Sequence, residues 1–305
     1  MAEAPSTAIL DAARRARGRL RRRTSYGAYR AYRLARLRWR RRPVDRWNPV
    51  LVYQMGKVGS TAVTHGLRSS SLPRSVVHVH NLNPRSIQEI DDFGRAEYAR
   101  TGTISPVVLD AIFLAPRLAD MARRHPLDIV TLVREPVGRN LSGFFESLPA
   151  RHPEVAARIR TDDPDDASLL LARTTFVDDA LRHDPFSWFD EELRPVTGLD
   201  VFAEPFDPAQ GYAIYENERC RVLLLRFDDL AAVFGPAVER FFGVSDVSLP
   251  RHNDARDRDT AAAYQHLAGN LRLPTEDLHS IFGSERVRHF YSGEEIDRLI
   301  ARWSA

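Results

Sequence analysis

The residues of this 305-residue chain that could do chemistry gather first in a glycine-rich stretch, Gly56-Lys57-Val58-Gly59-Ser60-Thr61, which contains the only lysine. The chain has 44 lysines and arginines together, so every other basic residue is an arginine. Small residues at the start of a helix let backbone amides approach an anion, and a lysine adds a compact charge that the planar arginine fork does not reproduce. The stretch predicts a phosphate loop. It is not a Walker A motif, because its lysine precedes the second glycine.

A second anion site is predicted from an arginine and a serine in one later segment. Arg134 ends the strand-like run LDIVTLV, and Ser142 lies two turns into the helix-like run that follows. An arginine and a hydroxyl held in this way can share one phosphate, the first through charge and the second through a hydrogen bond. Together with the first loop, this pair marks two anion sites at the ends of two strands.

Strand-like and helix-like segments alternate from Trp47 onward, and they must position these residues. Apolar runs predict strands at residues 49–55, 75–80, 127–133, 211–216 and 220–227, the last two joined by a turn at Asn217-Glu218. Helical spacing predicts helices at residues 59–70, 84–100, 106–124, 136–148, 153–193 and 228–243 and after Thr260, the last one opening on a capping box of Ser292 and Glu295. The alternation predicts an α/β fold with a mainly parallel central sheet flanked by helices. In such folds ligands sit beyond the carboxyl ends of the strands.

The order of these motifs resembles that of the sulfotransferases that use 3′-phosphoadenosine-5′-phosphosulfate (PAPS) as donor, which have a P-loop-like fold. The resemblance is carried by a strand, the Gly-Lys-x-Gly-Ser-Thr loop, and a strand running into Arg-x-Pro-x-x-Arg-x-x-Ser. It implies that Lys57, Val58, Gly59, Ser60 and Thr61 bind the 5′-phosphosulfate of the donor. Arg134 and Ser142 would bind its 3′-phosphate.

Later segments extend the resemblance. RVLLLRFDDL is similar to the late core strand and acidic turn of the same sulfotransferases, whereas FSWFDEEL, GYAIY and RHFYSGEEI resemble a bacterial branch described as capsular polysaccharide synthesis proteins. The usual C-terminal Arg-Lys-Gly segment of the sulfotransferases is not present. RHNDARDRDTAAAY stands in the comparable place, with Arg256 and Arg258 as candidate substitutes.

The resemblance also implies catalytic roles. Negative charge grows on the bridging oxygen of the donor as the sulfuryl group leaves, and the Lys57 ammonium would stabilise it. VHVHNLNP resembles the Lys-Thr-His-Leu-Pro segment of cytosolic sulfotransferases and places His80 on the catalytic histidine, a residue type suited to general-base work near neutral pH. His78 stands where that family has lysine, and strand alternation puts it on the same face as His80. Three carboxylates are alternative bases: Glu146, Glu135 and Asp228.

The expected function is therefore transfer of a sulfuryl group from PAPS to a hydroxyl of a carbohydrate or small-molecule acceptor, without a metal. Two other functions stay open. A nucleotide-dependent phosphotransferase with a divergent loop would depend on Mg²⁺, and a non-catalytic member of the fold would bind a nucleotide or glycan without turnover. The aspartates of TDDPDDAS would suit the metal site of a glycosyltransferase, but they lie in a proline-interrupted acidic stretch that is typical of solvated surface.

The charge of the chain is unevenly distributed. Residues 1–48 hold 15 arginines against three acidic residues, whereas the whole chain carries only +3, so the remainder is acidic. We therefore expect an Arg-rich basic arm at residues 1–48 and a sulfotransferase-like α/β domain at residues 49–305. The arm is either a solvated segment or a basic amphipathic helix that binds an anionic membrane surface or an acidic polymer. Specific nucleic-acid binding is not expected, since no recognisable nucleic-acid module follows the arm.

The cellular location is inferred from cysteine usage and from the arm. The single cysteine, Cys220, excludes an intrachain disulfide, and nothing in the sequence demands an oxidising compartment. The arm has neither the apolar core of a signal peptide nor a stretch long enough to span a bilayer. These features predict a cytoplasmic protein, which would be peripheral at the inner membrane face if the arm is the membrane-binding helix and not a solvated segment.

Overall fold

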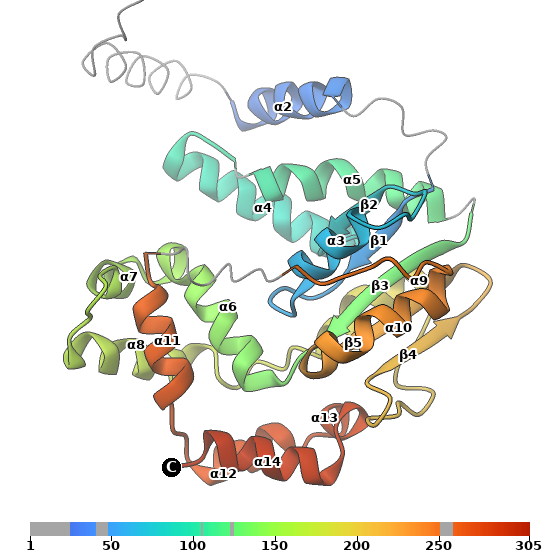
Figure 1. The fold of residues 1–305 in the computed structure, drawn as a ribbon. Coiled ribbons are helices and arrows are strands. Elements are labelled where there is room, and N and C mark those ends of the chain that lie inside the picture. Colours follow the sequence, from blue (N-terminus) through green and yellow to red (C-terminus); the bar gives the residue numbers. More distant parts are fainter. Residues whose placement is uncertain (1–24, 41–47, 105, 123–124, 251–258) are drawn as a thin grey trace, which may run out of the picture. The chain divides into compact units, whose positions relative to one another are not determined.

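The computed structural model describes residues 25–40, 48–104, 106–122, 125–250 and 259–305 (Figure 1). The chain divides into two compact units. One comprises residues 1–47 and 81–124, and the other residues 48–80 and 125–305. No helix among the described residues is long and apolar enough to cross a membrane.

The larger unit is built on a five-stranded sheet with the strand order β2-β1-β3-β5-β4. Its strands are β1 (Val50–Tyr53), β2 (Val76–Val79), β3 (Leu127–Val133), β4 (Tyr212–Glu216) and β5 (Cys220–Arg226). All neighbouring pairs are parallel except β4 and β5, which form an antiparallel pair across the Asn217 turn. The mainly parallel α/β sheet expected from the sequence is confirmed. The carboxyl ends of β1, β2, β3 and β5 therefore meet at one edge of the sheet.

Helices surround this sheet in the same unit (Figure 1). They are α3 (Ser60–Arg68), α6 (Pro136–Arg151), α7 (Pro153–Ile159), α8 (Asp166–Asp179), α9 (Arg194–Thr197), α10 (Leu230–Phe242), α11 (Ala261–Asn270), α12 (Thr275–Phe282), α13 (Glu285–Phe290) and α14 (Gly293–Trp303). A π-helix, η1 (Phe189–Leu193), and a 3₁₀ turn, η2 (Phe227–Asp229), complete the unit. The capping box at Ser292 is present at the start of α14, as predicted.

The expectation that residues 153–193 are mostly helical is confirmed, with breaks at residues 160–165 and 180–186. After α8 ends, the chain runs through turns over residues 180–186 and becomes helical again just before η1. The Asp184 side chain accepts a hydrogen bond from the amide of Phe186 at 2.9 Å, which is a local turn, and Pro185 has no amide to continue a helix. A polar turn residue followed by proline therefore interrupts the helix despite the apolar spacing.

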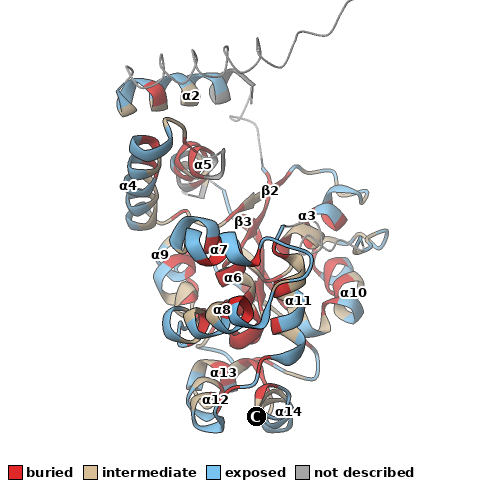
Figure 2. Cartoon of the chain, turned by 90° about the vertical axis from the view of Figure 1, so that its left-hand side faces the viewer, coloured by how far each residue is buried: buried red, intermediate tan, exposed pale blue. Residues whose placement is uncertain are grey.

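The core of the larger unit lies on both faces of the sheet. All four residues of β1 are fully buried, and β3 and β5 are buried over nearly their whole lengths. Such continuous apolar runs are typical of parallel strands that helices cover on both sides. Helices α3 and α10 pack against each other, since a Cβ on Gly66 of α3 would lie 2.8 Å from the ring of Phe234 of α10. Figure 2 shows the strands as buried and the outward faces of α7, α8 and α10 as exposed.

The smaller unit consists of three helices: α2 (Tyr26–Arg40), α4 (Pro84–Thr101) and α5 (Pro106–Ala122). Tyr29 and Tyr98 pack in its core with their ring centroids 4.9 Å apart. The Tyr26 hydroxyl and the Arg30 guanidinium both donate to Asp91 of α4 at 2.7 Å. The described part of the predicted arm is thus a helix whose aromatic side packs on its own chain. The boundary at residue 48 and a membrane or polymer partner remain predictions, and residues 1–24 and 41–47 lie outside the described residues.

Candidate functional site

The predicted phosphate loop joins β1 to α3 and has an unusual backbone. Lys57 and Gly59 both adopt left-handed conformations, with φ of 73° and 84°. No side chain caps the start of α3, so its first-turn amides keep their capacity to bind an anion. A Cβ on Gly59 would lie 2.7 Å from the ring of Phe227, so only glycine fits there. Val58 is fully buried and anchors the loop in the core.

The structure brings this loop against the second predicted motif. Arg134 Nη1 donates to the carbonyl oxygen of Lys57 at 3.1 Å, and Arg139 Nε donates to that of Gly56, also at 3.1 Å. A Cβ on Gly143 would lie 3.9 Å from Lys57 Cγ, so the lysine stem passes beside the residue that follows Ser142. The end of β3 and the first half of α6 thus hold the loop from one side.

Positive charge dominates where the two motifs meet. Lys57 Nζ lies 3.5 Å from Glu146 Oε1, and the lysine side chain is 18% exposed while that of Glu146 is 57% exposed. Burial lowers the pKa of the Arg139 guanidinium; Glu146 opposes this shift, and Arg134 adds to it. Lys57 and Arg139 therefore interact with the exposed Glu146, and Arg134 adds a third positive charge beside Arg139, an arrangement that favours a bound anion.

Phe227 connects the two motifs from the turn after β5. The Arg134 guanidinium lies over its ring at 4.6 Å from the centroid, which is a cation–π contact, while the ring touches Gly59. Ser142 is partly exposed, and its hydroxyl has no hydrogen-bond partner among the described residues. Arg134 is therefore oriented by Lys57 and Phe227, and Ser142 keeps its hydroxyl available to a ligand.

His80 lies just beyond β2, where its ring is held by the backbone of Gln54. Nδ1 lies 3.0 Å from the Gln54 carbonyl oxygen, which only accepts, and 3.1 Å from the Gln54 side-chain nitrogen, which only donates. In the tautomer that pairs with the carbonyl, Nδ1 carries the proton and Nε2 keeps its lone pair. Burial lowers the pKa of His80, while the Gln54 contact and the charge of Glu146 oppose the shift and Lys57 adds to it. A neutral ring with a free Nε2 lone pair is the form of histidine that accepts a proton. His78 is also neutral near pH 7, because burial lowers its pKa to about 4.

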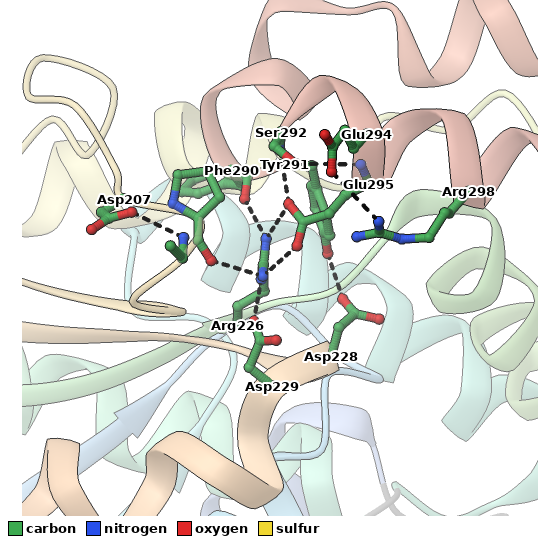
Figure 3. Close-up of polar contacts among 12 residues, drawn as sticks. Asp207, Arg226, Asp228, Asp229, Phe290, Tyr291, Ser292, Glu294, Glu295 and Arg298 are labelled. Carbon is green, nitrogen blue, oxygen red and sulfur yellow. Dashed lines mark hydrogen bonds and ion pairs between the residues drawn. The ribbon is translucent and has the colours of Figure 1, made fainter.

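The three alternative carboxylates differ in accessibility. Glu135 is only 2% exposed; its Oε1 accepts from the Gly138 amide at 2.7 Å, and its Oε2 has no partner. Asp228 is exposed, but it accepts a hydrogen bond from the buried Tyr291 hydroxyl at 2.7 Å (Figure 3). Glu146 alone among them pairs with Lys57 in the described structure. Glu135 is therefore a helix cap, and Glu146 is the carboxylate placed at the loop.

A buried arginine holds the turn that carries Phe227 and Asp228. Arg226, at the end of β5, donates to Asp229 and to both carboxylate oxygens of Glu295, at 2.9 and 2.7 Å for the latter (Figure 3). It also donates to the carbonyl oxygens of Phe290 and Pro208. These contacts join the end of β5 to α13 and α14, so the C-terminal helices help to position the site.

Another segment reaches the site from η1. Trp188 Nε1 donates to the carbonyl oxygen of His80 at 3.2 Å. Tyr53, at the end of β1, donates from its hydroxyl to Glu192 Oε1 at 2.6 Å. A π-helix is rare and frequently lies at a functional site. This part of the chain also lies within a region whose sequence matches a family model. Residues 169–292 match the model of the NKWYS family, described as “Putative capsular polysaccharide synthesis protein”.

The match relates this part of the chain to polysaccharide synthesis. It includes η1, β4 and β5, but it does not include the phosphate loop, His80, Arg134 or Ser142. No curated protein and no solved structure shows significant similarity to the chain. The match covers less than half of the chain and leaves out both predicted anion motifs.

Several residues of the site were not singled out from the sequence. Arg139 is the second arginine of the Arg-x-Pro-x-x-Arg motif, which could have drawn attention to it; Trp188 and Phe227 stand in the quoted segments FSWFDEEL and RVLLLRFDDL. No motif or spacing in the sequence indicates that Gln54 belongs to the site. Arg256 and Arg258 lie outside the described residues. Within the described ranges, no group of three His, Cys, Asp or Glu side chains is placed to hold a metal ion.

Proposed function

We propose that this protein is a PAPS-dependent sulfotransferase that acts on a hydroxyl of a carbohydrate or of a small molecule. The observation that carries the proposal is the hydrogen bond from Arg134 to the Lys57 carbonyl oxygen. It unites the phosphate loop with the second anion motif at the ends of two adjacent parallel strands. A donor with a phosphosulfate at one end and a 3′-phosphate at the other requires two such anion sites within reach of one another.

The residues present fit this donor. The uncapped start of α3 and the Lys57 ammonium would hold the phosphosulfate, and the remaining Arg134 donors and the Ser142 hydroxyl would hold the 3′-phosphate. The donor supplies the sulfuryl group, whose transfer leaves negative charge on the oxygen that bridged phosphorus and sulfur. The Lys57 ammonium is a compact positive charge in that loop, and its proposed role is to stabilise the negative charge on this bridging oxygen.

His80 is the proposed base. Its Nδ1 contact with Gln54 fixes the ring, and its Nε2 lone pair would accept the proton of the acceptor hydroxyl. Glu146 is the second candidate because it pairs with Lys57 and is exposed. Substituting His80→Ala and Glu146→Gln separately distinguishes the two, since only the loss of the base should remove turnover while donor-product binding persists.

Calorimetry with 3′-phosphoadenosine-5′-phosphate, the spent donor, tests the proposal without knowledge of the acceptor. The wild type is titrated in EDTA beside Lys57→Ala and Arg134→Ala. We expect micromolar affinity for the wild type and at least a tenfold weaker Kd, about 1.4 kcal/mol, for each variant. Arg298→Ala is the control, since Arg298 is an exposed arginine of α14 whose nearest partner is Glu294.

The outcomes separate the candidate functions. Absence of binding at millimolar ligand would reject the sulfotransferase. Binding of ATP that requires Mg²⁺ would indicate a phosphotransferase. Binding of the spent donor without any transfer from PAPS, unaffected by His80→Ala, would indicate a non-catalytic member of the fold.

A further inference from the structure

We propose that the segment 181–193, here called the acceptor segment, binds the acceptor and that a pyranose ring of a glycan stacks on Trp188. The identity of this ligand as an acceptor rests on the proposed function. The binding surface itself rests on the anchoring, the exposure and the family match of the segment.

Hydrogen bonds hold the first part of the acceptor segment to α6, which also carries Arg139 and Ser142. Asn140 of α6 donates from Nδ2 to the carbonyl oxygens of Leu181 and His183, at 3.3 and 2.8 Å. Asn140 directly follows Arg139, which holds the phosphate loop. One end of the acceptor segment is therefore fixed beside the cationic part of the site, although it lies some 40 residues further along the chain, as the 41- and 43-residue separations show.

The other end of the segment is fixed at the ends of β1 and β2. Trp188 donates to the carbonyl oxygen of His80, and its ring meets that of Tyr53 edge-to-face, with centroids 4.9 Å apart. The Tyr53 hydroxyl in turn donates to the buried Glu192. The indole is thus oriented by contacts on its polar edge and against Tyr53. A rigidly held aromatic side chain binds a ligand at low entropic cost.

The acceptor segment also carries exposed polar side chains. Trp188 keeps part of its surface exposed, and His183 and Glu191 are exposed as well. His183 lies within electrostatic reach of the site: burial and then Arg139 lower its pKa, and Asp184 and Glu191 oppose them. A pyranose presents apolar C–H faces and a rim of hydroxyls. A segment with an aromatic surface and hydrogen-bonding side chains offers both kinds of contact that such a ligand requires.

The family match favours a glycan over another small molecule. The matched residues 169–292 contain the whole acceptor segment, whereas the donor-site residues Lys57, Arg134 and Ser142 all lie outside them. The match also includes Phe227, which packs against Gly59 and Arg134, but it includes none of the predicted donor-binding residues. The acceptor segment, as a feature shared with this family, is therefore expected to recognise the polysaccharide rather than the donor.

Fluorine NMR of protein labelled with 5-fluorotryptophan tests the proposal. The chain has four tryptophans, and the spectrum of Trp188→Phe assigns the Trp188 resonance. Methyl glycosides of glucose, galactose, mannose, N-acetylglucosamine and glucuronic acid are titrated to about 50 mM, because a ligand of this size is expected to bind with roughly millimolar Kd. Sorbitol, a polyol without a ring, is the matched ligand control, and Trp303, only 1% exposed, is the internal reference.

We expect the Trp188 resonance to shift saturably with at least one pyranoside, while sorbitol has no effect and Trp303 does not move. Ligand-observed NMR should show at least tenfold weaker binding for Trp188→Ala and no change for Tyr32→Ala, which removes an aromatic side chain that is 60% exposed on α2. If no pyranoside shifts Trp188, or if sorbitol shifts it equally, the proposal is wrong. The wild-type titration decides this even if Trp188→Ala does not fold.

The two proposals fail in different ways. Sugar binding at Trp188 without binding of the spent donor would support glycan binding by this segment and reject the sulfotransferase. Binding of the spent donor without any pyranoside effect would keep the sulfotransferase and place its acceptor elsewhere.

Discussion

Arg134 donates a hydrogen bond from Nη1 to the carbonyl oxygen of Lys57, although 77 residues separate them in the chain. The contact gives a reason for the left-handed φ of Lys57. With that backbone conformation the carbonyl points to the arginine, while the side chain runs beside Gly143 towards Glu146. The Lys57 carbonyl therefore accepts from Arg134, while the lysine ammonium lies against Glu146 of α6.

This conformation should cost stability. A residue with a Cβ in the left-handed region is strained by roughly 1 kcal/mol relative to glycine. We expect Lys57→Gly to have a free energy of unfolding about 1 kcal/mol higher than that of Lys57→Ala, although both remove the ammonium and both weaken binding of the spent donor. Urea denaturation of the pair measures the difference. Equal stability would show that Lys57 carries no backbone strain.

Gly59 should be intolerant of a side chain because of Phe227. Gly59→Ala combines a left-handed φ with a Cβ placed 2.7 Å from the Phe227 ring, so we expect a loss of about 2–3 kcal/mol in unfolding free energy. In the Phe227→Leu background the smaller side chain relieves the contact, and the cost of Gly59→Ala should fall to the backbone strain of about 1 kcal/mol. Thermal unfolding of the four proteins checks this, and an unchanged cost in the Leu background would contradict it.

The elements that the sequence predicts well are those fixed by local pattern. The third strand begins and ends at the expected residues, Leu127 and Val133, and the capping box at Ser292 forms as its spacing requires. The glycine-rich loop between β1 and α3 is also local, because its small residues and one lysine lie within six positions, whereas its binding of phosphate stays a prediction. In contrast, the mostly helical stretch expected at residues 153–193 is broken at residues 180–186, because one turn residue and one proline outweigh the apolar spacing.

The contacts that assemble the site could not be read from the sequence. The pairs Arg139–Gly56, Trp188–His80 and Arg226–Glu295 are separated by 83, 108 and 69 residues, and no periodicity links them. Which of the candidate carboxylates is accessible at the loop likewise depends on burial, which the sequence does not show. Glu135 and Glu146 lie on or beside one helix, yet the first is enclosed and the second faces solvent.

Glu135 should make stability depend on pH in the neutral range. Burial raises its pKa to about 7 against the charge of Arg134, and Asp228 adds to the rise. The folded state thus binds this proton more tightly than the unfolded chain does. The stabilising contribution is complete below about pH 4.5 and is lost as the pH rises through about 7, by at most roughly 1.4 kcal/mol per pH unit.

Glu135→Gln tests this because the amide oxygen can still accept from the Gly138 amide but cannot ionise. Urea denaturation from pH 5 to 8 should show the variant gaining stability over the wild type as the pH rises. Glu146→Gln, a change at an exposed carboxylate, should show no such trend. His78 acts in the opposite direction, since its pKa of about 4 removes stability as the pH falls below about 6.5; comparison with the wild type at each pH cancels this contribution. A constant difference between Glu135→Gln and the wild type would mean that Glu135 is ionised throughout.

Arg226 and Glu295 should be strongly coupled. The Arg226 side chain is 3% exposed, and its guanidinium is surrounded by Asp229, Glu295 and two backbone carbonyls. Removing the cation leaves those acceptors without their donor. The Asp229 and Glu295 side chains are 32% and 22% exposed, so water can replace part of the lost interaction. We expect Arg226→Met to lower the unfolding free energy by about 2–4 kcal/mol, less than for a fully enclosed pair.

The double variant Arg226→Met/Glu295→Gln should recover part of that loss, because the amide carries no charge that needs a partner. We expect a coupling energy of about 1–2 kcal/mol from the four-protein cycle. Burial raises the pKa of Glu295, but hydrogen bonds from Arg226 and from the Ser292 amide outweigh it and lower the pKa overall. The stabilisation is therefore present above about pH 4.5 and is lost as the pH falls further. Glu295→Gln should reduce this loss of unfolding free energy below about pH 4.5, but only when Arg226 is present. Additive effects within about 0.5 kcal/mol would show that the C-terminal helices are held to the end of β5 by packing rather than by this arginine.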